Sequence, residues 1–309
     1  MRQAVMTEPG KIEFGEAEEP KAGAGEILLR IKRIGVCGSD IHVYHGKHPF
    51  TPYPVVQGHE YSGVVEAVGE GVEDVKPGTL ATARPQLVCG KCGPCRRGDY
   101  NVCEKLRVQG FQAPGCAQDL FVVPKDRFVP LPKSLTVEQG ALVEPASVGA
   151  HSTARASDVA GKNAIVLGAG TIGNMVAQFV RCRGAKNILI TDISDYRLEI
   201  ARKCGIKNTS NAGKESLADA VKRVFGEEGF QVAFEAAGVE ATLSAAIANI
   251  EKGGEIVVLG VFGEKPCIDM SVVGEHELSL IGTLMYKHED YVEAAQMISE
   301  GKIITEPLV

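Results

Sequence analysis

From about residue 162 onward, short apolar segments alternate with amphipathic ones, and this alternation constrains the fold more than any other feature. We expect strands at Ala164–Leu167, Ile188–Asp192, Val232–Glu235, Glu255–Leu259 and Leu278–Ile281. Most of these segments lack polar alternation, as is typical of strands that helices cover on both faces. Because parallel strands need crossover connections, the pattern predicts an α/β fold with a doubly wound parallel sheet.

Helices are expected between these strands. The clearest runs over Ile172–Arg183, where apolar residues recur at i, i+3, i+4, i+7 and i+8 and form one stripe. Others are expected over Asp195–Cys204, Glu215–Phe225 and Glu240–Ile250. Gly205 follows the second of these helices, at the position where a left-handed residue ends a helix.

The first half of the chain follows a different pattern, with short β segments broken by Gly and Pro. Strands are expected at Glu26–Arg33, Tyr61–Val68, Thr79–Ala83 and Leu120–Val123. With 309 residues the chain is about twice as long as a typical domain. We therefore predict a β-rich domain followed by the α/β domain, with the functional site in a cleft between them.

Composition argues against several classes of function. The 33 basic and 39 acidic residues give a formal charge of −6, so a broad basic face for nucleic acid is not expected. No segment approaches the ~18 consecutive apolar residues of a membrane span, and the first residues do not resemble a signal peptide. Four of the nine cysteines lie within residues 89–103, which favours metal or thiol chemistry in a reducing compartment. The sequence predicts a cytoplasmic protein with no nucleic-acid or membrane partner.

A glycine-rich turn marks the start of the α/β half. The segment AIVLGAGTIGNMVAQF places Gly168, Gly170 and Gly173 in a G-x-G-x-x-G pattern between a strand and a helix. The first glycine permits a tight turn, the second lets the backbone approach a pyrophosphate, and the third lets the helix pack on the strand. Thr171 and Ile172, at the junction of the turn and the helix, are further candidates for cofactor binding, because free N–H groups at a helix start face the anion. The alternative is a turn that only needs small residues.

An acidic residue follows at the end of the next strand. Asp192 lies 19 residues after Gly173, where a carboxylate accepts hydrogen bonds from the adenosine ribose and repels a 2′-phosphate. The two features together predict a Rossmann domain that binds NAD. NADP remains the less favoured alternative, because the guanidinium of Arg197 could pair with a phosphate. Asp192 could also simply cap the following turn.

The cysteine-rich segment CGKCGPCRRGDYNVC contains Cys89, Cys92, Cys95 and Cys103 in a C-x₂-C-x₂-C-x₇-C spacing. Such spacing lets four thiolates converge on one tetrahedral ion, and four sulfurs leave no open position, so we predict a structural zinc site. An iron–sulfur cluster is an alternative, but the last spacing differs from that of bacterial ferredoxins. Unligated thiols are the other alternative.

A second, mixed set of metal-binding residue types is spread over three segments. RIGVCGSDIHVYHGKHPF contains Cys37, QGHEYSGVV contains His59 and Glu60, and GALVEPASVGAHS contains Glu144. Thiolate, imidazole and carboxylate ligands from distant segments are typical of catalytic zinc, which keeps one position for water or substrate. Taken singly, these residues could equally be a buried thiol, a core histidine and an acid at a helix start.

In this arrangement the chain resembles the zinc-dependent medium-chain alcohol and polyol dehydrogenases, of the sorbitol- and threonine-dehydrogenase branch. That family carries G-[IV]-C-G-[ST]-D-x-H and G-H-E elements, a four-cysteine lobe and a nucleotide-binding half in the same order. The resemblance implies a GroES-like catalytic domain over residues 1–146, with the zinc lobe at about 86–106, and a Rossmann domain over 147–281. It also implies that residues 282–309 begin a return to the catalytic domain and that the chain is truncated there.

The resemblance also implies roles for individual residues. Cys37, His59 and Glu144 resemble catalytic zinc ligands, and Glu60 resembles a ligand or an exchanging partner beside water. Other residues resemble the carboxylate that orients the histidine ligand (Asp40), the hydroxyl that contacts the substrate oxygen (Ser39), a proton-relay member (His42) and a substrate contact (Tyr286). One catalytic and one structural zinc ion per chain are therefore expected.

The implied reaction is hydride transfer from a secondary alcohol to NAD⁺, with zinc acting as a Lewis acid on the substrate hydroxyl. A glutamate in place of a second catalytic cysteine makes the zinc set harder and favours a small polyhydroxy substrate, a polyol or sugar acid. The alternatives are an L-threonine 3-dehydrogenase-like oxidoreductase and a non-catalytic, redox-responsive NAD-binding protein. The resemblance suggests a homodimer or homotetramer.

Overall fold

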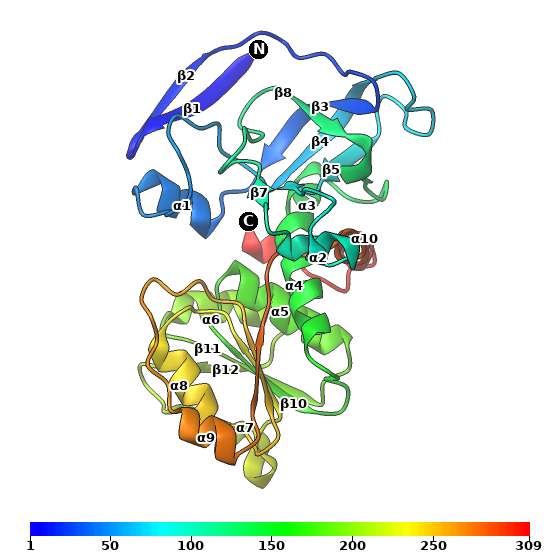
Figure 1. Cartoon of the computed structure of the whole chain (residues 1–309). Coiled ribbons are helices and arrows are strands. Elements are labelled where there is room, and N and C mark those ends of the chain that lie inside the picture. Colours follow the sequence, from blue (N-terminus) through cyan, green and yellow to red (C-terminus); the bar gives the residue numbers. More distant parts are fainter. The chain divides into compact units, whose positions relative to one another are not determined.

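The computed structural model describes residues 1–309 as two compact units (Figure 1). The first comprises Met1–Glu144 and Lys287–Ser299, and the second comprises Pro145–Tyr286 and Glu300–Val309. The sequence analysis placed the first boundary after residue 146 and assigned all of 282–309 to the return segment. The structure instead starts the return at Lys287 and leaves the last ten residues with the second unit.

The side chain of Gln178 accounts for the placement of these last residues. It is fully buried, and its Nε2 donates to the carbonyl of Ile304 (3.1 Å) while its Oε1 accepts from the N–H of the same residue (2.6 Å). Arg181 adds a hydrogen bond from Nη2 to the carbonyl of Lys302 (2.8 Å). Side-chain bonds of this kind leave no pattern in the sequence, so the return to the second unit was not foreseen.

An antiparallel sheet forms the body of the first unit. Its strand order is β8 (Leu120–Pro124), β3 (Glu26–Ile34), β4 (Tyr61–Val68), β5 (Leu80–Ala83) and β9 (Phe128–Pro130). Two ribbons accompany it, β1 (Arg2–Glu8) with β2 (Lys11–Glu16), and β6 (Gln86–Leu87) with β7 (Arg107–Val108). The core contains Ile27, Leu29, Tyr61 and Phe121, whose side chains are at most 5% exposed.

The helices of the first unit are short, apart from α10. They are α1 (Gly38–Tyr44), α2 (Gly93–Arg96), α3 (Val137–Ala141) and α10 (His288–Ser299), with 3-10 turns η1 (Tyr100–Val102) and η2 (Lys125–Arg127). Helix α4 (Val143–Arg155) starts at the end of the first segment of this unit and continues into the second. The prediction of a β-rich unit is confirmed.

A six-stranded parallel sheet forms the second unit. Its order is β12 (Asn208–Asn211), β11 (Asn187–Asp192), β10 (Asn163–Leu167), β13 (Val232–Glu235), β14 (Glu255–Val258) and β15 (Ser279–Gly282). If the six strands are numbered 1 to 6 along the chain, their order in the sheet is 3-2-1-4-5-6, which is that of the Rossmann fold. The direction in which strands are added changes next to the first strand, β10. The predicted doubly wound sheet is confirmed.

Helices cover both faces of this sheet. They are α5 (Thr171–Cys182), α6 (Asp195–Lys203), α7 (Leu217–Phe225), α8 (Glu240–Asn249) and α9 (Met270–Glu275), with 3-10 turns η3 (Gly226–Glu228) and η4 (Glu306–Leu308). Alternate residues of β10 join two different apolar clusters, Ala164 and Val166 on one face and Ile165 and Leu167 on the other. All four are at most 2% exposed, which explains why this strand shows no polar alternation.

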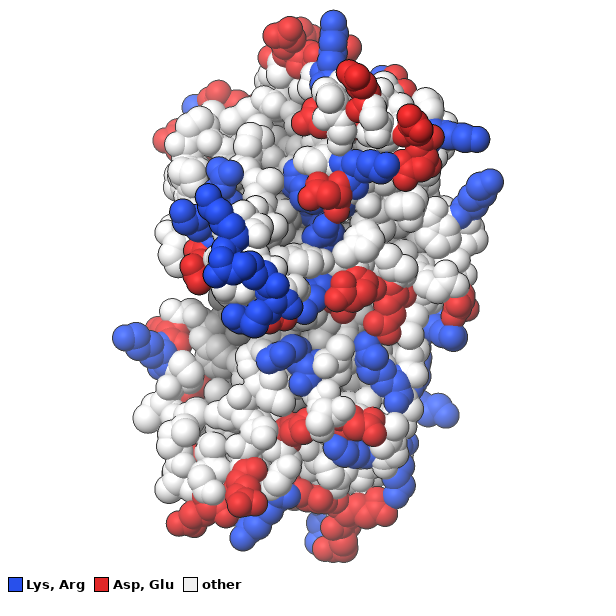
Figure 2. Space-filling model, turned by 45° about the vertical axis from the view of Figure 1, so that its right-hand side comes forward, with Lys and Arg blue, Asp and Glu red and all other residues white.

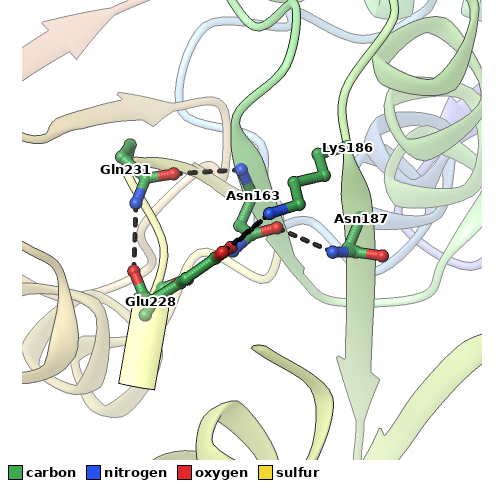
Figure 3. A network of polar contacts seen from close by, with 6 residues as sticks. Asn163, Lys186, Asn187, Glu228 and Gln231 are labelled. Atoms are coloured by element: carbon green, nitrogen blue, oxygen red, sulfur yellow. Dashed lines mark hydrogen bonds and ion pairs between the residues drawn. The ribbon is translucent and has the colours of Figure 1, made fainter. Parts of the chain in front are cut away.

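A polar network joins the first residues of strands β10 and β11 to the residues just before β13 (Figure 3). It lies at the opposite end of β10 from the glycine-rich turn. Asn163, the first residue of β10, accepts from Nδ2 of Asn187 (2.9 Å), and its backbone N–H donates to Oε1 of Gln231 (3.0 Å). Glu228 pairs with Lys186 (2.6 Å) in the same network. Because Asn163 is only 2% exposed, its polar atoms must be satisfied by these neighbours.

Charged side chains of both signs are interspersed over the face shown in Figure 2, and one group of Lys and Arg stands together near its middle. None of the helices combines the length and the apolar character needed to cross a bilayer.

Candidate metal and cofactor sites

Helix α1 starts at the N-cap residue Cys37 and fixes the first part of the candidate metal site. The backbone N–H of Cys37 donates to Oδ2 of Asp40 (2.9 Å), which lies in the first turn. Asp40 is buried, and burial raises the pKa of its carboxyl group to about 6. A carboxylate in the first turn also suits the positive end of the helix dipole.

The second oxygen of Asp40 faces His59, which enters from the segment before β4. Oδ1 of Asp40 lies 3.7 Å from Nδ1 of His59 and 3.4 Å from Nε2 of Gln57. His59 is 5% exposed, and burial lowers its pKa to about 4, so the imidazole is neutral near pH 7. Nδ1 has no hydrogen-bond partner of its own. A proton on Nδ1 would face the carboxylate and leave Nε2 as a lone-pair donor for a metal ion.

Glu60 completes a compact set of three ligands. The ligand atoms of Cys37, His59 and Glu60 all lie within 4.8 Å of one another. The carboxyl group of Glu60 packs over Gly35, where a Cβ would overlap its Oε2. Burial first, and then the charge of Asp40, raise the pKa of Glu60 to about 7.

The electrostatics of this set indicate a missing positive charge. Burial, followed by the charges of Glu60 and Glu144, raises the pKa of the Cys37 thiol to about 12. A divalent cation reverses this balance, since it stabilises thiolate and carboxylate together. The donor set of sulfur, imidazole nitrogen and carboxylate oxygen fits zinc with an open position.

Glu144 does not belong to the compact set of three ligand atoms, although the sequence analysis grouped it with them. It is 5% exposed, lies in the first turn of α4, and its charge acts on Cys37. Its place in the ligand shell remains a prediction.

The remaining residues of the predicted catalytic and substrate set differ in exposure. Ser39 is half-buried in the first turn of α1, and His42 is exposed in the last turn of that helix. Tyr286 belongs to the second unit and is fully buried. The structure therefore places Ser39 and His42 on the helix that follows Cys37, while the substrate contact of Tyr286 remains a prediction.

Two residues at this site were missed by the sequence analysis. The ring of Phe111 lies 4.9 Å from the centre of the His59 ring and stacks on His48 at the same separation. Gln57 donates to Asp40, as described above. Gln57 could have been suspected from its position two residues before His59, but nothing near Phe111 in the sequence indicates its role.

The four cysteines of the second cluster lie together beside the β6–β7 ribbon. The sulfur atoms of Cys89, Cys92, Cys95 and Cys103 lie within 4.8 Å of one another. Backbone N–H groups donate to these sulfurs, from Cys92 to Cys89 and from Lys105 to Cys103, each at 3.3 Å. Such bonds, led by those from Lys91 and Cys92, lower the pKa of Cys89 to about 6. Four clustered sulfurs with N–H donors fit a tetrahedral zinc ion.

The glycine-rich turn has the geometry that a dinucleotide needs. Gly168 has a φ of +105°, and a Cβ on Gly173 would overlap the Gly168 carbonyl oxygen. Gly170 is the N-cap of α5, and a Cβ there would meet nothing within 4 Å. The first and third glycines are thus needed by the fold itself, whereas the second keeps space open in front of the helix.

Asp192 ends β11 beside this turn and holds it in place. Its Oδ2 accepts from the N–H of Ala169 (2.8 Å), and its Oδ1 accepts from the N–H of Ser194 (2.9 Å). Arg197 lies with Nη1 3.6 Å from Oδ2 of Asp192. Asp192 therefore caps the following turn, as the alternative interpretation proposed. Its contact with the ribose of a dinucleotide remains a prediction.

Comparison with known proteins agrees with this geometry. Residues 23–133 match the alcohol dehydrogenase GroES-like domain, and residues 171–300 match the zinc-binding dehydrogenase domain. The 2-dehydro-3-deoxy-L-galactonate 5-dehydrogenase of Pseudoalteromonas atlantica is 35% identical over 296 residues, covering 96% of this chain and 86% of the relative.

This chain belongs to the zinc-dependent medium-chain dehydrogenase family. The L-threonine 3-dehydrogenase of Idiomarina loihiensis is 34% identical over 272 residues, covering 87% of this chain and 79% of the relative. The structure of a short chain alcohol dehydrogenase from E. coli CFT073, complexed with NADH, superposes on this chain with a TM-score of 0.92 at 30% sequence identity. The superposition covers 100% of this chain and 90% of the E. coli chain. The chain is accordingly a dehydrogenase that uses zinc and a nicotinamide dinucleotide.

Proposed function

We propose that this dehydrogenase oxidises a secondary alcohol of a polyol or sugar acid and transfers the hydride to NAD⁺. The observation that carries the proposal is the buried set of Cys37, His59 and Glu60, with ligand atoms within 4.8 Å and with Asp40 behind His59. A protein that only bound a nucleotide would need none of these residues. A relative named for a sugar-acid substrate supports the substrate class.

Cys37, His59 and Glu60 would hold the catalytic zinc ion, and Glu144 is proposed as a further ligand or as a carboxylate that exchanges with Glu60. When bound, zinc supplies a Lewis acid and NAD⁺ supplies the hydride acceptor. Asp40 keeps the imidazole of His59 in one orientation through Nδ1.

Proton removal is assigned to residues of α1. The hydroxyl of Ser39 would accept the proton of the substrate hydroxyl, and the imidazole of His42, on the last turn of the same helix, would pass it to solvent. The exposure of His42 suits this second step, since a relay must end at bulk water. Tyr286 is proposed as a substrate contact.

NAD⁺ is proposed as the preferred cofactor because Asp192 would oppose a 2′-phosphate. Both carboxylate oxygens are already held by backbone N–H groups, so the acid cannot easily turn away. Thr171 and Ile172, at the start of α5, would present free N–H groups to the pyrophosphate. Arg197 would have to leave Asp192 to bind a 2′-phosphate.

The second candidate is oxidation of an amino alcohol such as L-threonine, which the similarity to the Idiomarina enzyme favours. Formation of NADH, followed by its absorbance with a panel of polyols, aldonates and L-threonine, separates the two. Turnover of polyols or aldonates above L-threonine is expected. Faster turnover of L-threonine would favour the second candidate, and no turnover across the panel by zinc-loaded protein would favour a non-catalytic nucleotide-binding protein.

Metal content tests the two zinc sites separately. One zinc ion in each site is expected in the parent chain, measured by elemental analysis of purified protein. Cys37→Ala should lose only the catalytic ion because the four-cysteine site shares no ligand with it. Cys267→Ala, which alters an exposed thiol outside both clusters, should lose none. A parent chain with a single zinc ion would contradict the presence of two sites.

We also propose that the protein acts in the cytoplasm, where a reducing environment keeps its nine cysteines out of disulfides, and that it forms a homodimer or homotetramer.

A further inference from the structure

A cavity of the first unit is lined by cations and borders the four-cysteine site, because Cys89 and Cys95 also belong to its lining. Its volume is about 620 Å³, and it is bounded by the β6–β7 ribbon, η2 and one side of the cysteine lobe. Four basic residues line it, namely Arg84, Lys105, Arg107 and Arg127, whereas Asp126 is the only acidic one. The lining therefore carries an excess of positive charge.

Two of these cations are buried and incompletely partnered. Arg84 and Arg127 are each only 8% exposed. Nε of Arg84 and Nη1 of Arg127 are buried without a hydrogen-bond partner. Arg84 is held by a bond from Nη2 to the carbonyl of Asp126 (2.6 Å) and by the ring of Tyr100, 5.0 Å from its guanidinium. Neither contact supplies a negative charge.

Arg84 and Arg127 make no direct ion pair, whereas other arginines of the same unit do. Arg30 pairs with Glu66 at 2.9 Å and Arg33 pairs with Glu138 at 2.7 Å, both at the surface. No carboxylate lies within ion-pair distance of Arg84 or Arg127. Burial, and to a lesser extent the neighbouring charge of Arg84, lower the pKa of Arg127. The charges of Asp126 and Glu26 act on Arg127 in the opposite sense, but neither carboxylate pairs directly with a guanidinium group. Two buried guanidinium groups with no direct ion pair are costly unless an anion joins them.

The cysteine sulfurs of the zinc lobe are not direct partners of the guanidinium groups of Arg84 and Arg127. Their sulfurs accept hydrogen bonds from backbone N–H groups of Cys89, Cys92 and Lys105. The guanidinium groups make no bond to them. An anion that is both doubly charged and able to accept several N–H bonds remains the complement that the cavity lacks.

We propose that the cavity lined by Arg84, Lys105, Arg107 and Arg127 binds a phosphate-type dianion, as a second ligand site of this dehydrogenase. The planar guanidinium groups would bind its oxygens in pairs, and the exposed side chains of Lys105 and Arg107 would close over it from the rim. The site lies within the first unit and is independent of the glycine-rich turn of the second.

Calorimetric titration of inorganic phosphate into the zinc-loaded full chain tests this, at ionic strength held constant with chloride. One saturable site is expected, unchanged by saturating NADH. The variant Lys105→Gln/Arg107→Gln, which alters exposed side chains only, should weaken phosphate binding at least about tenfold, because each substitution removes a charge-assisted hydrogen bond. The matched control Lys21→Gln/Lys76→Gln removes two exposed charges of the same unit outside the cavity and should leave the affinity unchanged.

Arg127→Gln, checked for folding by circular dichroism, should abolish phosphate binding without loss of zinc. The proposal is overturned if the parent shows no saturable phosphate binding, if NADH displaces the phosphate, or if both double variants bind equally. It is also overturned if Arg127→Gln loses zinc while phosphate fails to bind to the parent, since the arginines would then balance the charge of the thiolates.

Discussion

Asp40 is the residue proposed to orient the imidazole of His59, whose Nδ1 lies 3.7 Å from its Oδ1. Replacing it with Asn keeps an oxygen for the N–H of Cys37 but removes the charge that faces Nδ1 of His59. Because carboxylates behind histidine ligands stabilise metal binding, Asp40→Asn should weaken catalytic zinc affinity about 10- to 100-fold. Competition with a chromophoric chelator measures this affinity.

The matched control is Glu66→Gln, which removes a carboxylate of the same unit that pairs with Arg30 at the surface. Its zinc affinity should equal that of the parent, since exposed ion pairs contribute little. Equal zinc affinity in Asp40→Asn and in the parent would show that Asp40 serves only to cap α1.

At the scale of single residues, the sequence identified the candidate metal ligands, which lie in short motifs. It did not identify the side chains that pack against these ligands. Cys37, His59 and Glu60 lie in short elements of suitable chemistry, and the structure brings their ligand atoms together. Phe111 packs on His59 only because a distant loop folds back, and its neighbours in the sequence carry no metal-binding residue types. The role of Arg127 could not be predicted from the sequence either, since its burial and its lack of a direct ion pair depend on the fold.

At the scale of elements, two glycine substitutions in the turn between β10 and α5 should have different effects, one on stability and the other on dinucleotide binding. Gly173→Ala places a methyl group on the Gly168 carbonyl and should destabilise the second unit by a few kcal/mol, on the order of 1–3 for overpacking. Gly170→Ala meets no atom within 4 Å, so the fold should remain intact while the methyl group obstructs the pyrophosphate.

Urea unfolding and NADH titration of both variants measure the two effects. Gly170→Ala should unfold at the urea concentration of the parent and bind NADH at least about tenfold more weakly. Normal NADH affinity in this variant would show that the dinucleotide does not approach Gly170.

The pattern of apolar residues along the chain identified most strands and helices of the sheet, because their buried positions are apolar. The expected strands agree with the structure to within one residue at each end, for example Val232–Glu235, because buried strands are apolar throughout. Strand β12 was missed because its sequence, Asn208–Asn211, is polar and lies at the sheet edge. Helix α4 was missed because its Gly, Ser and Pro residues mask a helical stripe, although its middle is buried.

At the scale of the whole molecule, the two units have separate cores and separate proposed ligands. The four-cysteine site lies in the first unit and the dinucleotide turn in the second. A structural zinc ion contributes to the folding free energy of the segment that it holds, and a ligand stabilises the native state that it binds. The two ligands should therefore protect different parts of the chain.

Hydrogen exchange followed by mass spectrometry can resolve this in the full chain. Removal of zinc should speed exchange in peptides around Cys89–Cys103, whereas NADH at about 100 times its Kd should slow exchange in β10 and α5 by up to the equivalent of ~2.7 kcal/mol. With zinc retained, NADH should leave the cysteine lobe unaltered, because its sulfur–backbone bonds lie within the first unit. If either ligand protected both regions equally, the two units would open as one cooperative body, and their separate cores would not define separate folding units.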